Sequence, residues 1–455
     1  MKNLHILTTS IAAIAASTQS LFAETLLVPE QYPDIQSAIN AASNGDTVDV
    51  GPGTYEGFKL NNNNQAPIVV SVISRAGSES TFLSSPPTNE PRMIYIYSPM
   101  KGTQILVSGF TIKDYIHESQ TDLIYAFDYD GTSVKITDFK MIDCTNTQSN
   151  YPMIYGGDWE DVEFRGCSGK IYRGSPDIQR GIFHSCTSST ELLEECSLSE
   201  CTFTGCGGND LVSGSAVLRN CNFQENIVRS CIRPPTNFTV EGCSFELNQG
   251  MQIYVDSGNQ GFQGQVVNCV FENNSAANFG TGIFSRWNGQ IYISGCEFFG
   301  NTANIASGAI HQESGEVVLI GTDVCGNMPN NIGGSVEFDD PSNNISVNCE
   351  EEFSCCLPGS CLVLPASTCA DAGGISLTGD CNQEDCPNEG ACCIDGDCVF
   401  TTLETCFDLG GNYAGFGTDC ASTICESTCE GDISGNGDVG LTDLIAVLSN
   451  WGPCP

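Results

Sequence analysis

The sequence predicts an all-β protein built as a solenoid of stacked parallel strands, and three observations lead to this prediction. A Cys-x-Phe word occurs five times, and its phenylalanines are Phe203, Phe223, Phe245, Phe271 and Phe298. They are separated by 20, 22, 26 and 27 residues, which is the period of a stacked repeat. In four of the words an Asn follows the Phe by three residues, where it suits the turn after a strand. Because Cys and Phe point to one face of a strand, we expect the phenylalanines to form one buried stack.

The N-terminus has the pattern of a secretory signal peptide over residues 1–23. Lys2 supplies the positive charge, residues 11–16 the apolar run, and Leu21-Phe22-Ala23 a cleavage site. Elsewhere the sequence contains no run that approaches the roughly 18 uninterrupted apolar residues of a membrane-spanning helix. The chain's 27 cysteines fit an oxidising compartment. We therefore expect a secreted protein, extracellular or at the cell surface, without a transmembrane segment.

A short helix is expected ahead of the first coil, where it would cover the open end of the stack. Asp34 can cap this helix, whose apolar face is formed by Ile35, Ala38, Ile39 and Ala42. The segment IQSAINAASNGDTVDVGPGTYEG, residues 35–57, resembles the opening of right-handed parallel β-helix proteins of the pectin-lyase-like superfamily. The resemblance implies a right-handed parallel β-helix over residues 24–349. At about 20 to 30 residues per coil this length predicts roughly nine to eleven coils.

A second resemblance lies in residues 269–311. The segments CVFENNSAANFGTGIF and CEFFGNTANIASGAIH are similar to the F-x-x-N and G-G-A-I repeats of polymorphic outer-membrane (autotransporter) passengers. Those passengers are surface β-helices tied to adhesion, so the resemblance implies the same fold and an adhesive role. The second Gly-Gly of that pattern is Ser307-Gly308 in this chain.

Two cysteine-rich modules follow, at residues 353–387 and 390–426. Both read C-C-x4-C-x7-C, then Gly-Gly, then C-x4-C. About 35 residues cannot bury enough apolar surface to fold unaided, so six cysteines per module predict three disulfides in each. Zinc is the alternative, although neither module contains a histidine. The cysteines are Cys355, Cys356, Cys361, Cys369, Cys381 and Cys386 in the first module, and Cys392, Cys393, Cys398, Cys406, Cys420 and Cys425 in the second.

Residues 427–455 contain a loop with EF-hand spacing, which predicts a Ca²⁺ site. Its expected ligands are Asp432, Ser434, Asn436, Asp438 through its carbonyl, and Asp443. The Asp at position 12 and Val439 at position 8 resemble a dockerin calcium repeat. The resemblance implies an attachment unit with a cohesin-like or envelope partner, although dockerins usually carry two such repeats and this chain shows one. Cys429 and Cys454 bracket the unit and are expected to pair; the alternative is an acidic turn that binds no ion.

Charge and cysteine count restrict the function further. The net charge of −39 makes nucleic acid an improbable partner, since phosphate backbones need Lys and Arg patches. Thirteen cysteines lie in the predicted solenoid, so an intramolecular pairing of all of them is impossible. We expect the stacked Cys221, Cys243, Cys269 and Cys296 to be reduced and packed, because burial keeps a thiol protonated.

In one stretch of the sequence, acidic, basic and aromatic residues could converge on one wall of the solenoid. Its candidate catalytic residues are Asp128, Asp130, Asp158 and Arg165, and its candidate carbohydrate-binding residues are Tyr125, Tyr129, Tyr155 and Trp159. The superfamily resemblance implies lyases, hydrolases and esterases that act on acidic polysaccharides, but this stretch does not match their local motifs. The alternative is that these residues are solvated faces and turns.

The sequence is compatible with two functions from different classes. The first is a non-catalytic stalk, adhesin or glycan-binding surface that contacts an extracellular polysaccharide or a cell-surface component. The second is a polysaccharide-active enzyme, a lyase or glycoside hydrolase, on the same fold. The absence of a recognisable catalytic motif favours the first, and fold alone cannot decide between them.

Overall fold

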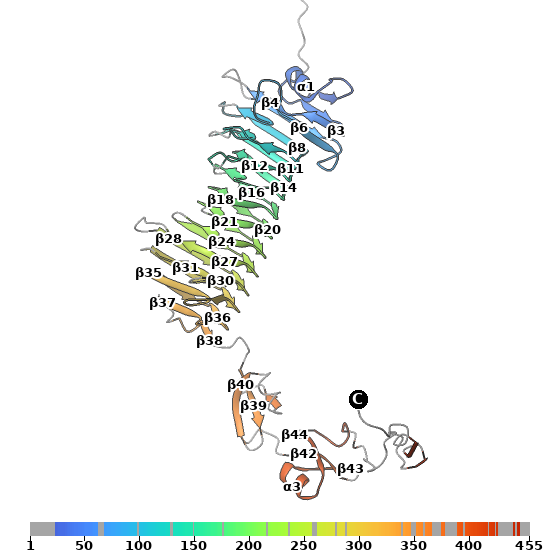
Figure 1. Ribbon diagram of the computed structural model, residues 1–455, viewed down its shortest axis with the longest axis vertical. Coiled ribbons are helices and arrows are strands. Elements are labelled where there is room, and N and C mark those ends of the chain that lie inside the picture. The colour runs from blue at the N-terminus through green and yellow to red at the C-terminus, as the bar shows by residue number, and fades with distance from the viewer. Residues whose placement is uncertain are drawn as a thin grey trace, which may run out of the picture. The chain divides into compact units, whose positions relative to one another are not determined.

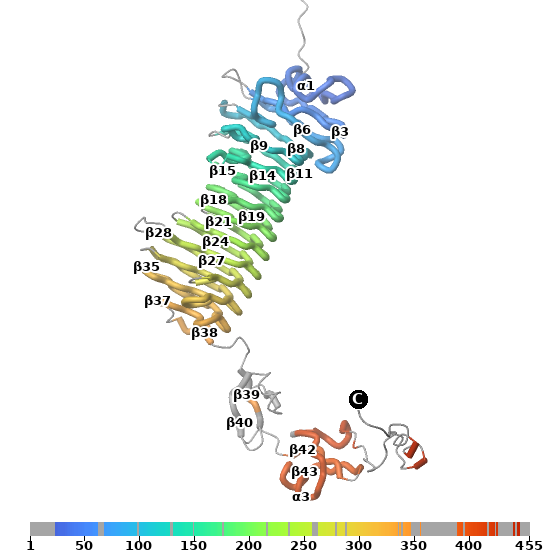
Figure 2. Tube along the Cα trace, viewed as in Figure 1, coloured from blue at the N-terminus to red at the C-terminus, as the bar shows by residue number. Residues whose placement is uncertain are grey.

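The chain divides into two compact units, residues 1–348 and residues 349–455, and Figures 1 and 2 show the computed structural model. The structure describes residues 23–445 except for residues 62–67, 98–99, 128–130, 149, 175–176, 215–216, 235–236, 257–261, 278–279, 287–288, 338–339, 347–351, 358–359, 366–374, 378–388, 395, 417, 424, 426–439 and 442–443. The predicted signal peptide therefore lies almost wholly outside the described residues.

The first unit is a solenoid whose coils each contribute a strand to three walls, and every wall pairs its strands in parallel (Figure 1). The first wall contains β1 (Thr25–Val28), β2 (Thr47–Val50), β5 (Val69–Ser74), β8 (Gln104–Lys113), β11 (Ser133–Ile142), β14 (Asp158–Arg165), β16 (Asp177–Gln179), β19 (Ser197–Ser199), β22 (Val217–Arg219), β25 (Phe238–Glu241), β28 (Phe262–Val267), β32 (Gly289–Ser294), β35 (Ile310–Ile320) and β37 (Ile332–Glu337).

The second wall holds the strands of the phenylalanine words. It contains β3 (Gly53–Glu56), β6 (Thr81–Ser85), the second halves of β8, β11 and β14, β17 (Ile182–His184), β20 (Thr202–Thr204), β23 (Asn222–Gln224), β26 (Ser244–Glu246), β29 (Val270–Glu272), β33 (Glu297–Phe299), β36 (Asp323–Cys325) and β38 (Asn344–Ser346). Thirteen described strands thus stack in this wall, so the expected nine to eleven coils were wrong. The central coils are tighter than the average used: Phe183, Phe203 and Phe223 are 20 residues apart.

The third wall contains β4 (Phe58–Asn61), β7 (Ile94–Tyr97), β10 (Ile124–Ala126), β13 (Ile154–Tyr155), β15 (Tyr172–Arg173), β18 (Thr187–Glu194), β21 (Gly207–Ser213), β24 (Ile227–Arg233), β27 (Gln249–Val255), β31 (Ile283–Ser285) and the first parts of β35 and β37. Short strands pair at the corner between the second and third walls: β9 (Ile116–His117) with β12 (Thr145–Asn146), and β30 (Ser275–Ala276) with β34 (Thr302–Ala303).

The predicted phenylalanine stack is confirmed and is longer than expected. Rings from Phe164 and Phe183 continue it toward the N-terminus, so seven phenylalanines lie face over face with centroids 4.4–5.0 Å apart. All seven side chains are buried. Because each ring covers its equivalent in the next coil, the stack sets the register of the second wall and fills the interior at the same time.

A second buried column follows the phenylalanines at the next corner. Its members from Asn226 onward are linked coil to coil: Asn226 Nδ2 donates to Asn248 Oδ1 at 2.9 Å and to the carbonyl of Phe203 at 3.0 Å. The same contacts recur in the following coils. Nearer the N-terminus, cysteines take the place of asparagine in this column: Cys144, Cys167, Cys186 and Cys206. The corner is thus closed by an amide ladder in one half and by thiols in the other.

The cysteines of the Cys-x-Phe words form a column of their own. Cys201, Cys221, Cys243, Cys269 and Cys296 are buried and belong to no disulfide, which confirms the expectation of reduced, packed thiols. Cys325, further along the solenoid, is disulfide-bonded. On the third wall, burial raises the pKa of the Cys231 thiol well above its ordinary value, so this sulfur stays protonated and unreactive.

The predicted capping helix is confirmed as α1 (Ile35–Ala41). Asp34 Oδ1 accepts a hydrogen bond from the backbone N–H of Ser37 at 2.6 Å, and Ile35 and Ala38 are buried against the first coils. Gln36 closes the open edge of β4, because its Oε1 accepts from Lys59 N at 2.8 Å and its Nε2 donates to Lys59 O at 3.1 Å. One side chain thereby stands in for a missing neighbouring strand at this position.

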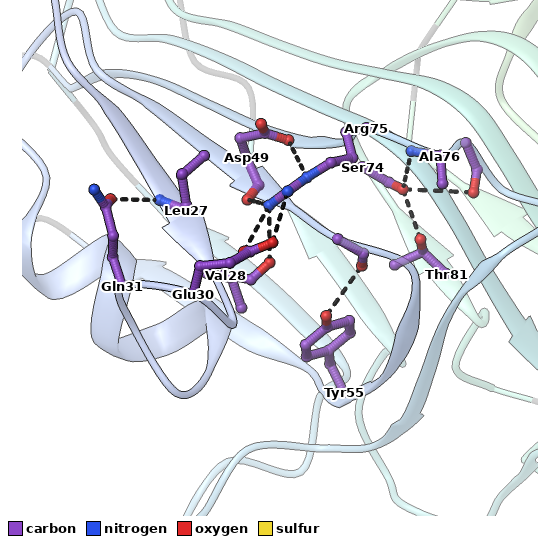
Figure 3. A network of polar contacts seen from close by, with 12 residues as sticks. Leu27, Val28, Glu30, Gln31, Asp49, Tyr55, Ser74, Arg75, Ala76 and Thr81 are labelled. Atoms are coloured by element: carbon purple, nitrogen blue, oxygen red, sulfur yellow. Dashed lines mark hydrogen bonds and ion pairs between the residues drawn. The ribbon is translucent and has the colours of Figure 1, made fainter.

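Arg75 ties the first coils together, as Figure 3 shows. Its guanidinium contacts both carboxylate oxygens of Glu30, at 2.8 and 2.9 Å, and donates to the carbonyl of Val28 at 3.1 Å. It also contacts Asp49 Oδ1 at 3.2 Å. The hydrogen bonds from Arg75 lower the pKa of Glu30. The cap is therefore held by polar contacts as well as by the apolar face of α1.

The second unit contains two small antiparallel sheets. The first sheet has β39 (Glu352–Leu357), β40 (Ser360–Pro365) and β41 (Ile375–Leu377), and Cys355 within it is disulfide-bonded. The second has β42 (Glu389–Ile394), β43 (Asp397–Thr402) and β44 (Asn412–Phe416) with the helix α3 (Leu403–Asp408). Disulfides Cys392–Cys406, Cys393–Cys425 and Cys398–Cys420 join all six cysteines of this module. Cys369, Cys381, Cys386, Cys429, Cys454 and the five expected Ca²⁺ ligands lie outside the described residues.

Candidate functional site: an aromatic ladder on the third wall

Five aromatic side chains form a regular array on the outside of the third wall, and we call them the aromatic ladder. Along β7, β10 and β13 the residues alternate, so isoleucines point into the core while the aromatic rings point out and stay half-buried. The ladder consists of Tyr95, Tyr97, Tyr125, Phe127 and Tyr155.

The ladder has two parallel rows. Tyr95, Tyr125 and Tyr155 are register partners in successive coils, with ring centroids 5.5 and 5.4 Å apart. Tyr97 and Phe127 form the second row at 5.4 Å, and each lies 6.0–6.4 Å from the neighbouring ring of the first row. Because the strands repeat every coil, the rings form an apolar strip that runs along the solenoid axis, and in each row one pair of rings is tilted, by 35° and 41°.

Two charged side chains border the ladder at equivalent places in neighbouring coils. The guanidinium of Arg92 lies 4.9 Å from the ring centroid of Tyr95 and 5.3 Å from that of Tyr125, and it forms an ion pair with Glu90 at 3.0 Å. Asp122 is 9 % exposed, and burial raises its pKa although Arg92, His117 and Arg173 act in the opposite direction. Burial likewise raises the pKa of Tyr125 to about 12, so its hydroxyl remains a hydrogen-bond donor at neutral pH.

The outward-facing column that contains Tyr95, Tyr125 and Tyr155 continues past the ladder with other residue types. Toward the C-terminus the strand register places Arg173 next to Tyr155, and Glu194 next to Arg173. Arg173 and Glu194 form an ion pair at 3.5 Å. Further along, Tyr254 and Phe284 belong to the same column but are only 7 % and 5 % exposed. The ladder is thus the part of this column where described aromatic side chains are half-buried rather than fully buried.

The structure places two of the carbohydrate-binding candidates on the ladder and one in the core. Tyr125 and Tyr155 are neighbouring rungs of the ladder, with ring centroids 5.4 Å apart and planes within 8°. Trp159 was wrongly assigned to the surface: it is 1 % exposed, and its Nε1 donates to the carbonyl of Gly156 at 3.1 Å inside the solenoid. Tyr129 lies outside the described residues.

The candidate catalytic residues do not form a cluster where the structure describes them. Asp158 lies at the start of β14 on the first wall, where its Oδ1 accepts from the backbone N–H of Asp177 at 3.4 Å. Arg165 ends the same strand on the second wall and is held by Glu163, with Nε 3.0 Å from Oε1. The expected convergence of Asp158 and Arg165 is therefore wrong. Asp128 and Asp130 fall in the gap at residues 128–130.

Carboxylates between these two residues are occupied by ion pairs. Glu160 contacts Lys135 and Arg180, and Arg180 also binds Asp161 with Nε 2.6 Å from Oδ1. Hydrogen bonds from Lys135 and Arg180 lower the pKa of Glu160, and Arg180 lowers that of Asp161. Carboxylates held ionised in this way cannot act as the general acid of a glycosidase, which needs a raised pKa.

Tyr95, Tyr97, Phe127, Arg92 and Asp122 were missed as site residues. A signal for the first was present, because Met93-Ile94-Tyr95 belongs to a motif that recurs every 30 residues with Tyr125 and Tyr155. In such a motif the isoleucine and the tyrosine must point to opposite faces of the wall. Asp122 had no local signal, since its environment is created by residues from other coils.

The described residues contain no group of three His, Cys, Asp or Glu side chains arranged to hold a metal ion. Among them there is also no helix of the length and hydrophobicity needed to cross a membrane.

A match to a family model agrees with the coil geometry. A family model described as the right handed beta helix region matches residues 160–324. A search of curated proteins found no match. Among solved structures, the A-module of the mannuronan C-5 epimerase AlgE6 from Azotobacter vinelandii is 11% identical, with 69% of this chain and 94% of that chain covered and a TM-score of 0.37.

Two further structures are catalytic domains of GH87 alpha-1,3-glucanases. One, in complex with tetrasaccharides, is 9% identical, with 76% of this chain and 70% of that chain covered and a TM-score of 0.35. The other, from Streptomyces thermodiastaticus, is 10% identical, with 68% and 65% covered and a TM-score of 0.34. The family match and the parallel register of the coils identify the first unit as a right-handed parallel β-helix.

Proposed function

We propose that this protein binds an extended, neutral polysaccharide outside the cell, without cleaving it, along the aromatic ladder. The observation that carries the proposal is the spacing of the first row, with ring centroids at 5.5 and 5.4 Å. This spacing is close to the length of one sugar unit in an extended β-1,4-linked chain. Successive sugar units can therefore lie along the outer side of the row, with their apolar C–H groups against successive aromatic side chains.

Charge favours a neutral ligand over a uronan. The two arginines at the ladder are already paired, Arg92 with Glu90 and Arg173 with Glu194. The whole chain carries a net charge of −39, which repels polyanions at low ionic strength. Arg92 is instead placed to hold the rings of Tyr95 and Tyr125 in position by stacking on them.

A glycoside hydrolase is the second candidate, and Asp122 is the observation that favours it. A buried carboxyl with a raised pKa beside an aromatic strip is the kind of group that serves as a general acid. A hydrolase also requires a second carboxylate at a distance of roughly 5 to 9.5 Å from the first. We place binding first because the carboxylates Glu160 and Asp161, near the predicted catalytic residues, are held in ion pairs with Arg180.

The C-terminal unit is proposed to anchor the solenoid. The disulfides of the second cysteine-rich module favour an oxidising, extracellular location. The EF-hand spacing of Asp432, Ser434, Asn436, Asp438 and Asp443 supports a Ca²⁺-dependent attachment unit. In this arrangement the tail fixes the protein to a surface component and the β-helix presents the ladder to the polysaccharide.

An array of neutral and acidic polysaccharides tests the proposal. The protein is expected to retain β-1,4-linked glucan, mannan or glucomannan, and Tyr125→Ala should weaken binding at least tenfold. Tyr292→Ala is the matched control, because Tyr292 is also half-buried but lies on β32 of the first wall. Equal binding by both variants, or retention of uronans alone, would refute the proposal. Release of sugars that is lost in Asp122→Asn would establish the hydrolase instead.

A further inference from the structure

A cavity of about 260 Å³ lies between α1 and β4 at the N-terminal end of the solenoid. Its walls come from three segments: the start of α1, the turn from β3 to β4, and the loop after β6. Gln36, Glu56, Gly57, Lys59 and Thr88 are among its lining residues. The volume is below the roughly 300–1,000 Å³ of sites for drug-sized ligands, and it suits a single sugar ring.

The cavity continues the line of the aromatic ladder. Lys59 lines the cavity and is the register partner of Tyr95, so both side chains point to the same outer side of the third wall. The order along this column is therefore Lys59, Tyr95, Tyr125 and Tyr155, one residue per coil. At about 4.8 Å per coil, the cavity lies one sugar unit beyond the last aromatic ring.

The helix α1 closes the N-terminal end of the column formed by Lys59, Tyr95, Tyr125 and Tyr155. Gln36 binds both backbone groups of Lys59, at 2.8 and 3.1 Å, and thereby fixes α1 against the edge of β4. Gly57 forms part of the cavity wall, where the chain passes so close to the next coil that a Cβ at this position would lie 1.9 Å from the carbonyl oxygen of Met93. At this point of the cavity wall there is no room for a residue larger than glycine.

The polar groups of the cavity complement the hydroxyl groups of a sugar. Glu56 and Lys59 are both exposed, and among the described residues Lys59 has no carboxylate within ion-pair distance. A carboxylate accepts hydrogen bonds from two neighbouring hydroxyls, and an ammonium group donates to hydroxyl or ring oxygens. With Asp34 the lining carries two carboxylates against the ammonium group of Lys59, so the cavity disfavours an anionic ligand.

We infer that this cavity binds the terminal sugar of the polysaccharide whose following units lie on Tyr95, Tyr125 and Tyr155. The inference rests on the proposed function, and it adds that the protein recognises a chain end rather than any internal stretch. An end-specific protein binds once per chain whatever the chain length. A protein that used the ladder alone would bind long chains several times.

Soluble β-1,4-glucomannan, size-fractionated into short and long chains, distinguishes these cases. Calorimetry with the full-length protein is expected to give about one protein per chain for both fractions. The double variant Glu56→Gln, Lys59→Met should bind both fractions more weakly at the same one-to-one stoichiometry, because α1 still closes the line beyond the cavity. Lys113→Met, at the end of β8 on another wall, serves as a control and should behave like the unaltered protein.

Two results would overturn the inference in different ways. If the unaltered protein already binds in proportion to chain length, while Tyr125→Ala abolishes binding, the cavity is not an end site and the ladder proposal stands. If glucomannan, cellohexaose and xylohexaose all fail to bind, the ladder proposal fails and the end site fails with it. Circular dichroism of each variant separates a lost site from a lost fold.

Discussion

The rings of Phe271 and Phe298 lie parallel to within 1° with their centroids 4.4 Å apart, although 27 residues separate them in the sequence. The same face-to-face contact recurs along the whole stack. The interior of the second wall is therefore a continuous column of aromatic carbon, and the loss of one ring leaves a gap between two others.

Replacement of Phe245 by Ala is expected to lower the free energy of unfolding by about 3–5 kcal/mol, because it removes a fully buried ring and leaves a cavity between Phe223 and Phe271. Urea denaturation followed by far-UV circular dichroism measures the change. Phe400→Ala provides the control, since Phe400 is 53% exposed in the second unit. Equal stability of Phe245→Ala and the unaltered protein would contradict the role of the stack.

Replacement of Asn248 by Ala should also destabilise the solenoid. Its Oδ1 accepts from both the backbone N and the Nδ2 of Asn226, and its Nδ2 donates to Phe223 O and Asn274 Oδ1. Each buried group left without a partner costs about 1–3 kcal/mol. Hydrogen exchange should show the loss in the coils on either side. Asn222 is half-buried on the outer face of β23, and Asn222→Ala is the control. An equal effect of both substitutions would count against a stabilising role of the asparagine column.

Asp122→Asn is expected to stabilise the protein at neutral pH. Burial raises the folded-state pKa of Asp122 above its ordinary value of 3.8, so the folded state holds this proton more tightly than the unfolded state does. Its ionisation therefore costs stability, and the cost appears as the pH rises above the ordinary carboxyl range. Thermal melts should show the variant melting higher than the unaltered protein at pH 7 and at nearly the same temperature near pH 3. A lower melting temperature at pH 7 would mean that the charged form is the stabilised one.

Calcium should bind to the C-terminal loop with weak to moderate affinity, because Ser434 and Asn436 are neutral ligands and the charge of the ligands tunes affinity. Calorimetry of the full-length protein is expected to show one site that Asp432→Ala and Asp443→Ala each remove. Asp371→Ala changes the same charge outside the loop and should leave the site intact. Heat that is identical in all three variants would show that the acidic surface binds the ion without a defined site.

The sequence was informative where one coil repeats the next and uninformative where the chain turns a corner. Phe203 and Phe298 could be placed in one stack because every intervening word has the same spacing. Tyr155 and Trp159 are four residues apart, which on a single strand would place them on one face. Gly156 and Gly157 separate them, both with positive φ, and turn the chain so that Tyr155 points out and Trp159 points in. The environment of Asp122 depends on Arg92 from the previous coil and on Arg173 from a later one, and no local pattern encodes such a contact.

The asparagine column has a consequence for how this protein could have grown. Each amide bonds only to the coils next to it, so the column has no preferred length. Duplication of the segment from Asn226 to residue 247 would add one coil whose asparagine finds partners on both sides. The ladder and the capped end lie upstream of this region and would be untouched. Gene duplication can therefore lengthen the solenoid while the aromatic ladder and the capped end are inherited unchanged, so that the length of the solenoid and the surface of the ladder evolve as separate traits.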